Sequence, residues 1–204
     1  SFVQMAYNMT DMIWVGRIGS RAVAAVGTAG FYTWLAAAFI LISRIGAEVG
    51  VAQSVGKQDI AEAKAYIKHS IQLIVFLAII YAFVMIIFRK PLINFFNIAE
   101  QDIVDDAITY LVIISVGMVF YFINPVFTAI FNGYGESRTP FFINSLGLIV
   151  NMILDPILIL GIGPFPRLEV AGAALATIIA QFCVTVMFIA KAIRTEEMFS
   201  GLSL

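Results

Sequence analysis

The chain has 204 residues, of which 61% are hydrophobic and only 12% are charged, and its mean hydropathy is +0.98. Soluble domains carry about a quarter of charged residues, so this composition excludes a fully water-exposed surface and indicates an integral membrane protein. The formal net charge of −1 provides no electrostatic footprint for nucleic acid, and the single cysteine, Cys183, excludes an internal disulfide.

Six apolar segments follow one another with short connections. Their length favours membrane-spanning helices, because one span requires about 20 apolar residues. We therefore expect an all-α integral membrane protein with six transmembrane helices in a single domain over residues 1–204. The first helix is expected to be cut short at its N-terminal end, because the chain opens inside an apolar stretch. The expected helices cover residues 1–15, 22–54, 67–88, 107–131, 141–160 and 171–193.

The first two segments carry charged residues within apolar surroundings. Gln4, Asn8 and Asp11 lie within about 60° of one another on a helical wheel. A carboxylate inside the bilayer costs about 2.5–3.5 kcal/mol, which favours a functional role for Asp11. In the second segment, Arg44 and Glu48 are four residues apart, and this spacing predicts a structural ion pair on one helix face.

Polar residues in the fourth and sixth segments have two interpretations. In membrane helices such side chains commonly form hydrogen bonds between helices. We favour this interpretation for Asn124, Thr128, Gln181 and Thr185. Tyr121 and Asn124 are at the same time candidates to line a cavity.

The fifth segment contains the most informative pattern. Asn144, Asn151 and Asp155 are separated by seven and four residues, so an α-helix places them on one face within about 20° of Asn144. Pro156 has no N–H and leaves the carbonyl of Met152 without its helical partner. A carboxylate, two amides and a free carbonyl on one stripe predict a small-cation or proton site, with Asn144 lining the same cavity.

Five sequence motifs resemble, in the same order, those of MATE (multidrug and toxin extrusion) transporters. The closest branch is the prokaryotic, DNA-damage-inducible (DinF-like) one. The similarity extends over essentially the whole chain. The motifs are Y-N-M-T-D-M-I-W-V-G-R-I-G-S-R-A-V-A-A-V-G (7–27), V-A-Q-S-V-G-K-Q-D (51–59), F-N-G-Y-G-E-S-R-T-P (131–140), N-M-I-L-D-P-I-L-I-L-G (151–161) and E-V-A-G-A-A-L-A-T (169–177).

The resemblance implies one lobe of a transporter with twelve helices in two six-helix lobes. Its partners would be the lipid bilayer, a small organic substrate and the C-terminal six-helix lobe of the same protein. The implied activity is an antiporter in the cell inner (plasma) membrane that exports organic, often cationic, drugs or toxins in exchange for Na⁺ or H⁺. No other cofactor and no enzymatic reaction are implied. The N-terminal side and the loop near residue 57 would face the cytoplasm.

The resemblance also implies roles for individual residues. The cation or proton site would consist of Asp11, Asn151, Asp155 and Thr177, which would also be the Na⁺ ligands, and Gln4 and Asn8 would line the same cavity. Asp11 and Asp155 would face each other, and two carboxylates in a low-dielectric site cannot both remain charged at low cost. Binding of Na⁺ or a proton would relieve this repulsion and favour a different shape of the first helix. Arg44 is not expected from the family pattern.

Two other functions share some of these features. A lipid-linked oligosaccharide flippase of the same superfamily would have the same fold, but it requires a basic cavity, and only Arg44 lies within a span. An intramembrane aspartyl protease also uses two aspartates on different helices. Its aspartates follow Tyr or Gly-x-Gly, whereas Asp11 follows Thr10 and Asp155 follows Leu154 here. Both functions are therefore less favoured than the antiporter.

Overall fold

The computed structural model describes residues 2–200, except the side chains of residues 2–4, 7, 8, 196 and 197. Within this range the secondary structure is entirely helical. The helices are α1 (Phe2–Gly16), α2 (Ser20–Gly56), α3 (Ile60–Ile87), α4 (Arg89–Asn94), α5 (Gln101–Val116), α6 (Met118–Gly133), α7 (Arg138–Leu160), α8 (Glu169–Arg194) and α9 (Glu196–Phe199).

The helices have the length and composition of membrane spans. Among the described residues, α2, α3, α7 and α8 are each long and apolar enough to cross a bilayer, and α5 with α6 passes as a pair bent by 52°. Outward-facing side chains are apolar as well: Phe76 and Phe83 of α3 are each 61% exposed. Such large exposed apolar surfaces are covered by lipid in a membrane protein. The predicted all-α membrane lobe is thus confirmed.

The fourth expected helix, 107–131, is in fact two helices that meet at Gly117. The break does not occur at Pro125, which lies inside α6. At Gly117 the chain passes so close to α8 that a Cβ would overlap the side chain of Ile178. Glycine therefore permits the close approach at the bend, a tertiary requirement that the hydropathy pattern does not contain.

Helix α3 begins at Ile60, seven residues before the expected start at residue 67. Asp59 caps its N-terminus, and its carboxylate accepts a hydrogen bond of 2.9 Å from the backbone N–H of Glu62. The first two turns carry two charged residues, Glu62 and Lys64, and lie outside the apolar window, so a prediction based on hydropathy misses them. A local capping signal sets this boundary.

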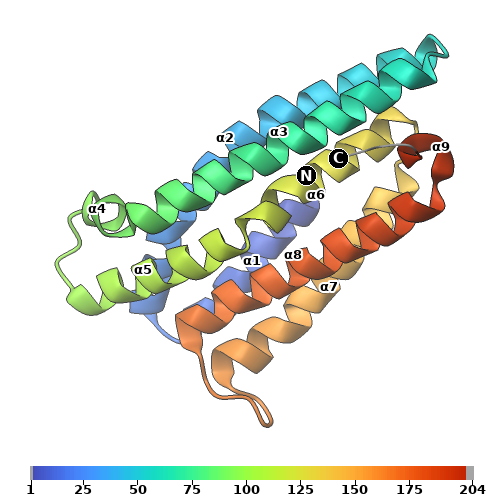
Figure 1. Cartoon of the computed structure of the whole chain (residues 1–204). Coiled ribbons are helices and arrows are strands. Elements are labelled where there is room, and N and C mark those ends of the chain that lie inside the picture. The colour runs from blue at the N-terminus through green and yellow to red at the C-terminus, as the bar shows by residue number, and fades with distance from the viewer. Residues whose placement is uncertain (1, 201–204) are drawn as a thin grey trace.

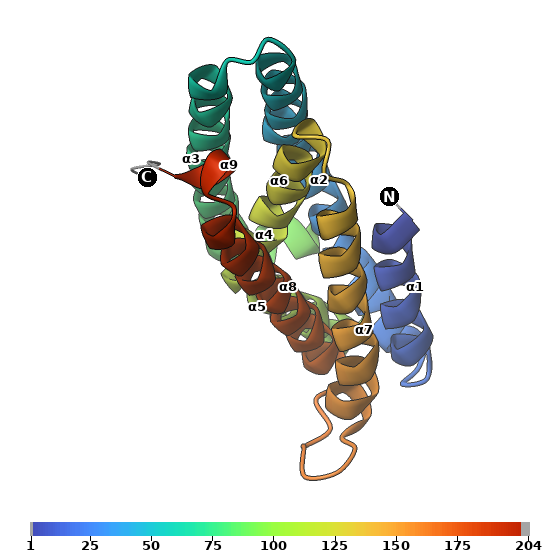
Figure 2. The same cartoon turned by 90° about the vertical axis from the view of Figure 1, so that its right-hand side faces the viewer.

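Two antiparallel helix pairs form the two sides of the lobe. Helices α2 and α3 run side by side along one edge, and α7 and α8 form the second pair (Figure 1). The bent α5–α6 unit lies between them and contacts both pairs. Helix α1 packs mainly against α7 (Figure 2). Residues on α1 are thereby brought next to residues on α7 and α8, although more than 120 positions separate α1 from α7 in the sequence.

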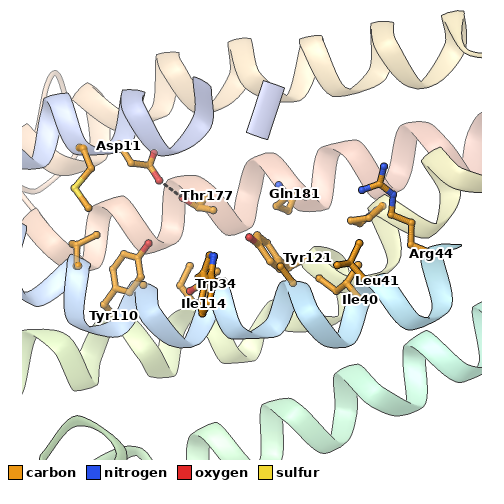
Figure 3. A pocket seen from close by; sticks show the side chains of 17 residues that line it. Asp11, Trp34, Ile40, Leu41, Arg44, Tyr110, Ile114, Tyr121, Thr177 and Gln181 are labelled. Atoms are coloured by element: carbon orange, nitrogen blue, oxygen red, sulfur yellow. Dashed lines mark hydrogen bonds between the residues drawn. The ribbon is translucent and has the colours of Figure 1, made fainter. Parts of the chain in front are cut away.

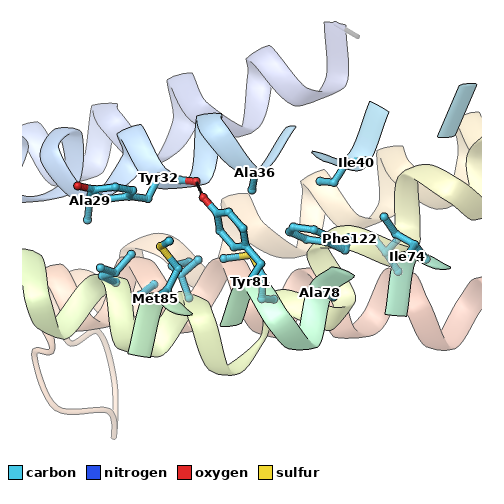
Figure 4. Close-up of a cluster of buried hydrophobic side chains, with 14 of the residues drawn as sticks. Ala29, Tyr32, Ala36, Ile40, Ile74, Ala78, Tyr81, Met85 and Phe122 are labelled. Atoms are coloured by element: carbon cyan, nitrogen blue, oxygen red, sulfur yellow. Dashed lines mark hydrogen bonds between the residues drawn. The ribbon is translucent and has the colours of Figure 1, made fainter. Parts of the chain in front are cut away.

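A buried cluster fixes α2 against α3, α4 and α6 (Figure 4). The Tyr81 hydroxyl donates a hydrogen bond to the backbone carbonyl of Tyr32, and the Tyr32 hydroxyl donates to the carbonyl of Leu92 at 2.6 Å. The Tyr81 ring lies 5.5 Å from the ring of Phe122. These cross-helix contacts hold α2 in position, and α2 supplies most of the wall of the cavity described below.

The return of the chain from α7 to α8 brings these two helices into close contact. Gly161 ends α7 in the left-handed conformation (φ 72°), and its N–H and that of Ile162 both lie 3.1 Å from the Ile157 carbonyl. Further along, a Cβ at Gly172 would overlap the backbone carbonyl of Leu158. The absence of a side chain at Gly172 therefore lets α8 lie directly on α7, as small residues do in membrane helix packing.

Candidate cation and substrate site

Two carboxyl groups from different helices meet in the interior of the lobe. Asp11 of α1 lies next to Asp155 of α7, and Asn151 is one turn before Asp155 on the same helix. Asp155 and Asn151 are fully buried, whereas Asp11 and Thr177 of α8 are 7% and 8% exposed. The structure therefore brings together all four residues that the family resemblance implied for the cation or proton site.

Only some of the oxygen atoms in this cluster have hydrogen-bond partners. The Thr177 hydroxyl donates to Asp11 Oδ2 at 3.1 Å and also lies 3.0 Å from the Ala173 carbonyl. The Asn151 amide donates from Nδ2 to Asp155 Oδ1 at 3.2 Å.

Three buried oxygen atoms lack hydrogen-bond partners within the described part of the chain: Asp11 Oδ1, Asn151 Oδ1 and Asp155 Oδ2. Buried acceptors are almost always satisfied, so a group of three requires an explanation. Oxygen atoms of carboxylates and amides are ligands for hard cations, and a proton could instead be shared by the two carboxyl groups. These oxygen atoms thus fit one Na⁺ or one H⁺.

A cavity of about 470 Å³ adjoins this cluster. Helix α2 forms most of its wall, and α1, α5, α6 and α8 complete it. Asp11 and Thr177 lie at one end and Arg44 at the other, with Trp34 and Tyr121 between them (Figure 3). Asn151 and Asp155 are not among the lining residues and are fully buried. The carboxylate pair therefore has one member that faces the cavity and one that is sealed off.

The predicted cavity-lining residues have different positions. Tyr121 lines the cavity, whereas Asn124 and Asn144 are not among its lining residues. Asn124 binds α8 through hydrogen bonds to Gln181 and Thr185, and Asn144 donates to Thr128 and to the Pro140 carbonyl. The bonds of Asn124 to α8 match the interpretation of helix–helix bonding. The side chains of two further predicted residues lie outside the described ones: Gln4 and Asn8.

The predicted ion pair between Arg44 and Glu48 is wrong. Among the described residues no ion pair joins them, and Arg44 instead lines the cavity. A spacing of four residues only permits contact between two long side chains. The guanidinium reaches into the cavity, where water or a ligand can solvate it.

Some cavity residues were not identified from the sequence, chiefly Thr33 and Trp34 of α2 and Tyr110 of α5. The hydroxyl oxygen of Thr33 is buried without a partner among the described residues. The sequence does contain a signal for the residues on α2, because cavity-lining positions recur there every three or four residues, which is the helical period. Helical periodicity defines such a face, but it does not show whether lipid, protein or a cavity covers it.

Comparison with known proteins places this geometry in context. A family model described as MatE matches residues 1–157. A probable multidrug resistance protein NorM from Thermotoga maritima is 30% identical over 180 residues, which are 88% of this chain and 39% of that protein. An FAD transporter from Shewanella oneidensis is 28% identical over 181 residues, or 85% of this chain and 38% of that protein.

Solved structures show the same fold. The crystal structures of MATE in the bent and the straight conformation superpose with TM-scores of 0.90 and 0.89 at 25% sequence identity. In both cases the match covers 99% of this chain and 44% of the solved chain. The chain thus spans about 39% of the NorM relative and less than half of these structures.

Proposed function

The chain belongs to the MatE family, and we propose that it forms one lobe of a secondary active transporter that exports small organic compounds in exchange for Na⁺ or H⁺. Relatives that match most of this chain include probable multidrug resistance proteins and an FAD transporter. This range supports a small-molecule substrate and does not favour a flippase or a protease. The partial coverage of the relatives supports a second lobe as partner, and their bacterial origin supports the plasma membrane as location.

The observation that carries this proposal is the cluster of unpaired oxygen atoms around Asp11 and Asp155. An ionisable residue at this depth in a membrane indicates a functional site. Two buried carboxylates without a cation repel each other, and each must also be desolvated. One Na⁺ or one proton between them removes the repulsion and occupies oxygen atoms that otherwise have no partner.

Ion binding can affect the cavity because one member of the pair belongs to α1. Asp11 lines the cavity, and among the described residues its one hydrogen bond to α8 comes from the Thr177 hydroxyl. When the ion holds Asp11 against Asp155, α1 is fixed to α7. When the ion leaves, repulsion favours separation of α1 from α7, so the two states differ in the wall of the cavity. An ion that binds the two states differently shifts their populations.

The test is efflux from proteoliposomes that contain the full-length transporter, with Na⁺ and H⁺ gradients imposed separately. We expect Asp155→Asn and Asp11→Asn to fold but to lose ion-driven efflux, because each removes one charge from the pair. Thr177→Ala removes only a neutral ligand and should reduce coupling less.

Asn144→Ala is the matched control, because Asn144 is on the same helix as Asp155 but bonds only to Thr128 and Pro140 among the described residues. Stabilisation by Na⁺ against heat should be lost in Asp155→Asn and kept in the control. Normal efflux and normal ion response in Asp155→Asn would show that Asp155 is only a buried structural residue.

A further inference from the structure

The cavity has opposite electrostatic character at its two ends. The end formed by Asp11 presents carboxylate oxygen atoms, whereas the other end presents the guanidinium of Arg44 (Figure 3). No hydrogen bond or ion pair of Arg44 is found among the described residues. A cation that faces a cavity within apolar surroundings requires an anion or water to offset its desolvation.

A second donor lines the cavity between Thr177 and Arg44 (Figure 3). Gln181 lines the cavity, and its Oε1 atom accepts a hydrogen bond of 2.7 Å from Asn124. This bond fixes the orientation of the amide and leaves the Nε2 group, which only donates, without a partner within the described part of the chain. Arg44 and Gln181 therefore both offer donors to the same space, and donors without acceptors favour a ligand with negatively charged oxygen atoms.

The wall between the two ends suits a flat, apolar group. Trp34 is 71% exposed and lines the cavity together with Tyr121. Gly27 and Gly30 belong to the same wall, and a Cβ at either position would meet nothing within 4 Å. Aromatic rings beside an open, smooth surface can stack on a planar ligand. A volume of about 470 Å³ lies in the range of sites for drug-sized molecules.

We propose that Arg44 is the specificity-determining residue of a subsite for an anionic group, and that the transported compounds include aromatic molecules bearing a phosphate or carboxylate. The anion binds to Arg44 and Gln181, and the ring lies against Trp34 and Tyr121. This assignment rests on the proposed transport function and deepens it. It differs from the expectation of cationic substrates, which would bind toward Asp11 instead.

The separation of the two ends keeps the anion away from the cation site. Asp11 and Arg44 lie at opposite ends of the cavity (Figure 3), so a bound anion at Arg44 does not displace the ion at the carboxylate pair. Anionic lipid headgroups carry the same phosphate chemistry as a soluble substrate. The experiment therefore has to distinguish these two sources of phosphate.

The test is equilibrium binding of two fluorescent probes to the full-length transporter in nanodiscs. Riboflavin 5′-phosphate and riboflavin share one ring system and differ only in the phosphate. We expect the phosphorylated probe to bind more tightly than riboflavin. Arg44→Gln should weaken binding of the phosphorylated probe about tenfold or more and leave riboflavin binding unchanged. Arg44→Lys should retain part of the preference, because it keeps the charge but not the planar fork.

Nanodiscs of phosphatidylcholine alone and nanodiscs with phosphatidylglycerol separate the two sources of phosphate. A preference for the phosphorylated probe in both supports a substrate subsite. A preference that disappears with phosphatidylglycerol would assign Arg44 to a lipid headgroup and overturn the proposal. Equal binding of the two probes, or a preference that Arg44→Gln leaves intact, would also overturn it.

These measurements require no ion gradient. A failure of the proposed ion coupling would leave the probe binding unaffected, whereas a failure of the anion subsite would leave ion-driven efflux dependent on Asp155. Thermal unfolding of Arg44→Gln serves as the folding control, and we expect it to match the parent protein because Arg44 has no partner to lose among the described residues.

Discussion

The hydrogen bonds of Asn124 allow a quantitative prediction about what holds α6 to α8. Its Nδ2 group donates to the Gln181 carbonyl at 3.0 Å and to Gln181 Oε1 at 2.7 Å, and its Oδ1 accepts from the Thr185 hydroxyl at 2.8 Å. The side chain is only 3% exposed. Three hydrogen bonds from one residue thus link two helices in the interior, and replacing Asn124 by alanine removes all of them.

The expected loss follows from measured hydrogen bonds between membrane helices. Each contributes about 0.6 kcal/mol on average and at most about 1.7, so three bonds correspond to about 2 kcal/mol for Asn124→Ala. Thr185→Val removes one of these bonds, and the coupling energy between the two substitutions should be about 0.6–1.7 kcal/mol. Thr28→Val is the matched control, because within the described part of the chain the Thr28 hydroxyl bonds only to the Ala24 carbonyl of its own helix.

The assay is reversible unfolding of the full-length transporter in mixed micelles, combined with efflux measurements on the same variants. We expect Asn124→Ala to lower stability and to retain coupled efflux in the folded fraction. Unchanged stability together with lost efflux would refute the structural role and would make Asn124 a substrate-contacting residue. A coupling energy near zero between Asn124→Ala and Thr185→Val would show that the hydrogen bond between these two side chains does not contribute to stability.

Two further substitutions test the packing and the capping described above. Gly172→Ala should destabilise the protein by about 1–3 kcal/mol in the same unfolding assay, because the new Cβ meets the Leu158 carbonyl. Gly46→Ala is the control: its Cβ meets nothing within 4 Å, so this substitution should be neutral or slightly stabilising. Equal effects of the two changes would contradict the close contact between α7 and α8. Asp59→Ala should cost about 1 kcal/mol through loss of the N-cap bond to Glu62, and faster backbone hydrogen exchange confined to the first turns of α3 would confirm it.

Local patterns predicted the long apolar helices, though not every boundary, and the shared face of Asn151 and Asp155. Hydropathy identifies the long helices because lipid requires a continuous apolar surface. The spacing of Asn151 and Asp155 defines a shared face because both belong to one helix. By contrast, the hydrogen bond between Thr177 and Asp11 joins α8 to α1, and the helical period of either segment contains no information about it. Resemblance to a known family supplied that pairing.

Other features depend on tertiary contacts that no local pattern encodes. The bend at Gly117 reflects the proximity of Ile178 on α8, although Pro125 is the stronger local signal for a kink. Arg44 provides a second case, since its spacing from Glu48 is compatible with an ion pair and with a free guanidinium. Which of the two occurs depends on whether a cavity lies beside α2, and this follows only from the packing of α5, α6 and α8 around it.

The arrangement of the carboxylate pair restricts how an ion can enter and leave. Asp155 is fully buried, whereas Asp11 lines the cavity, so in the proposed exchange we expect an ion from the cavity to meet Asp11 first. Asp11 is carried by α1, which packs mainly against α7. In the proposed transport cycle, a displacement of α1 from α7 would expose Asp155 and reshape the cavity wall in a single movement. The proposed exchange of ion and substrate would then be coupled, because both would depend on the position of α1.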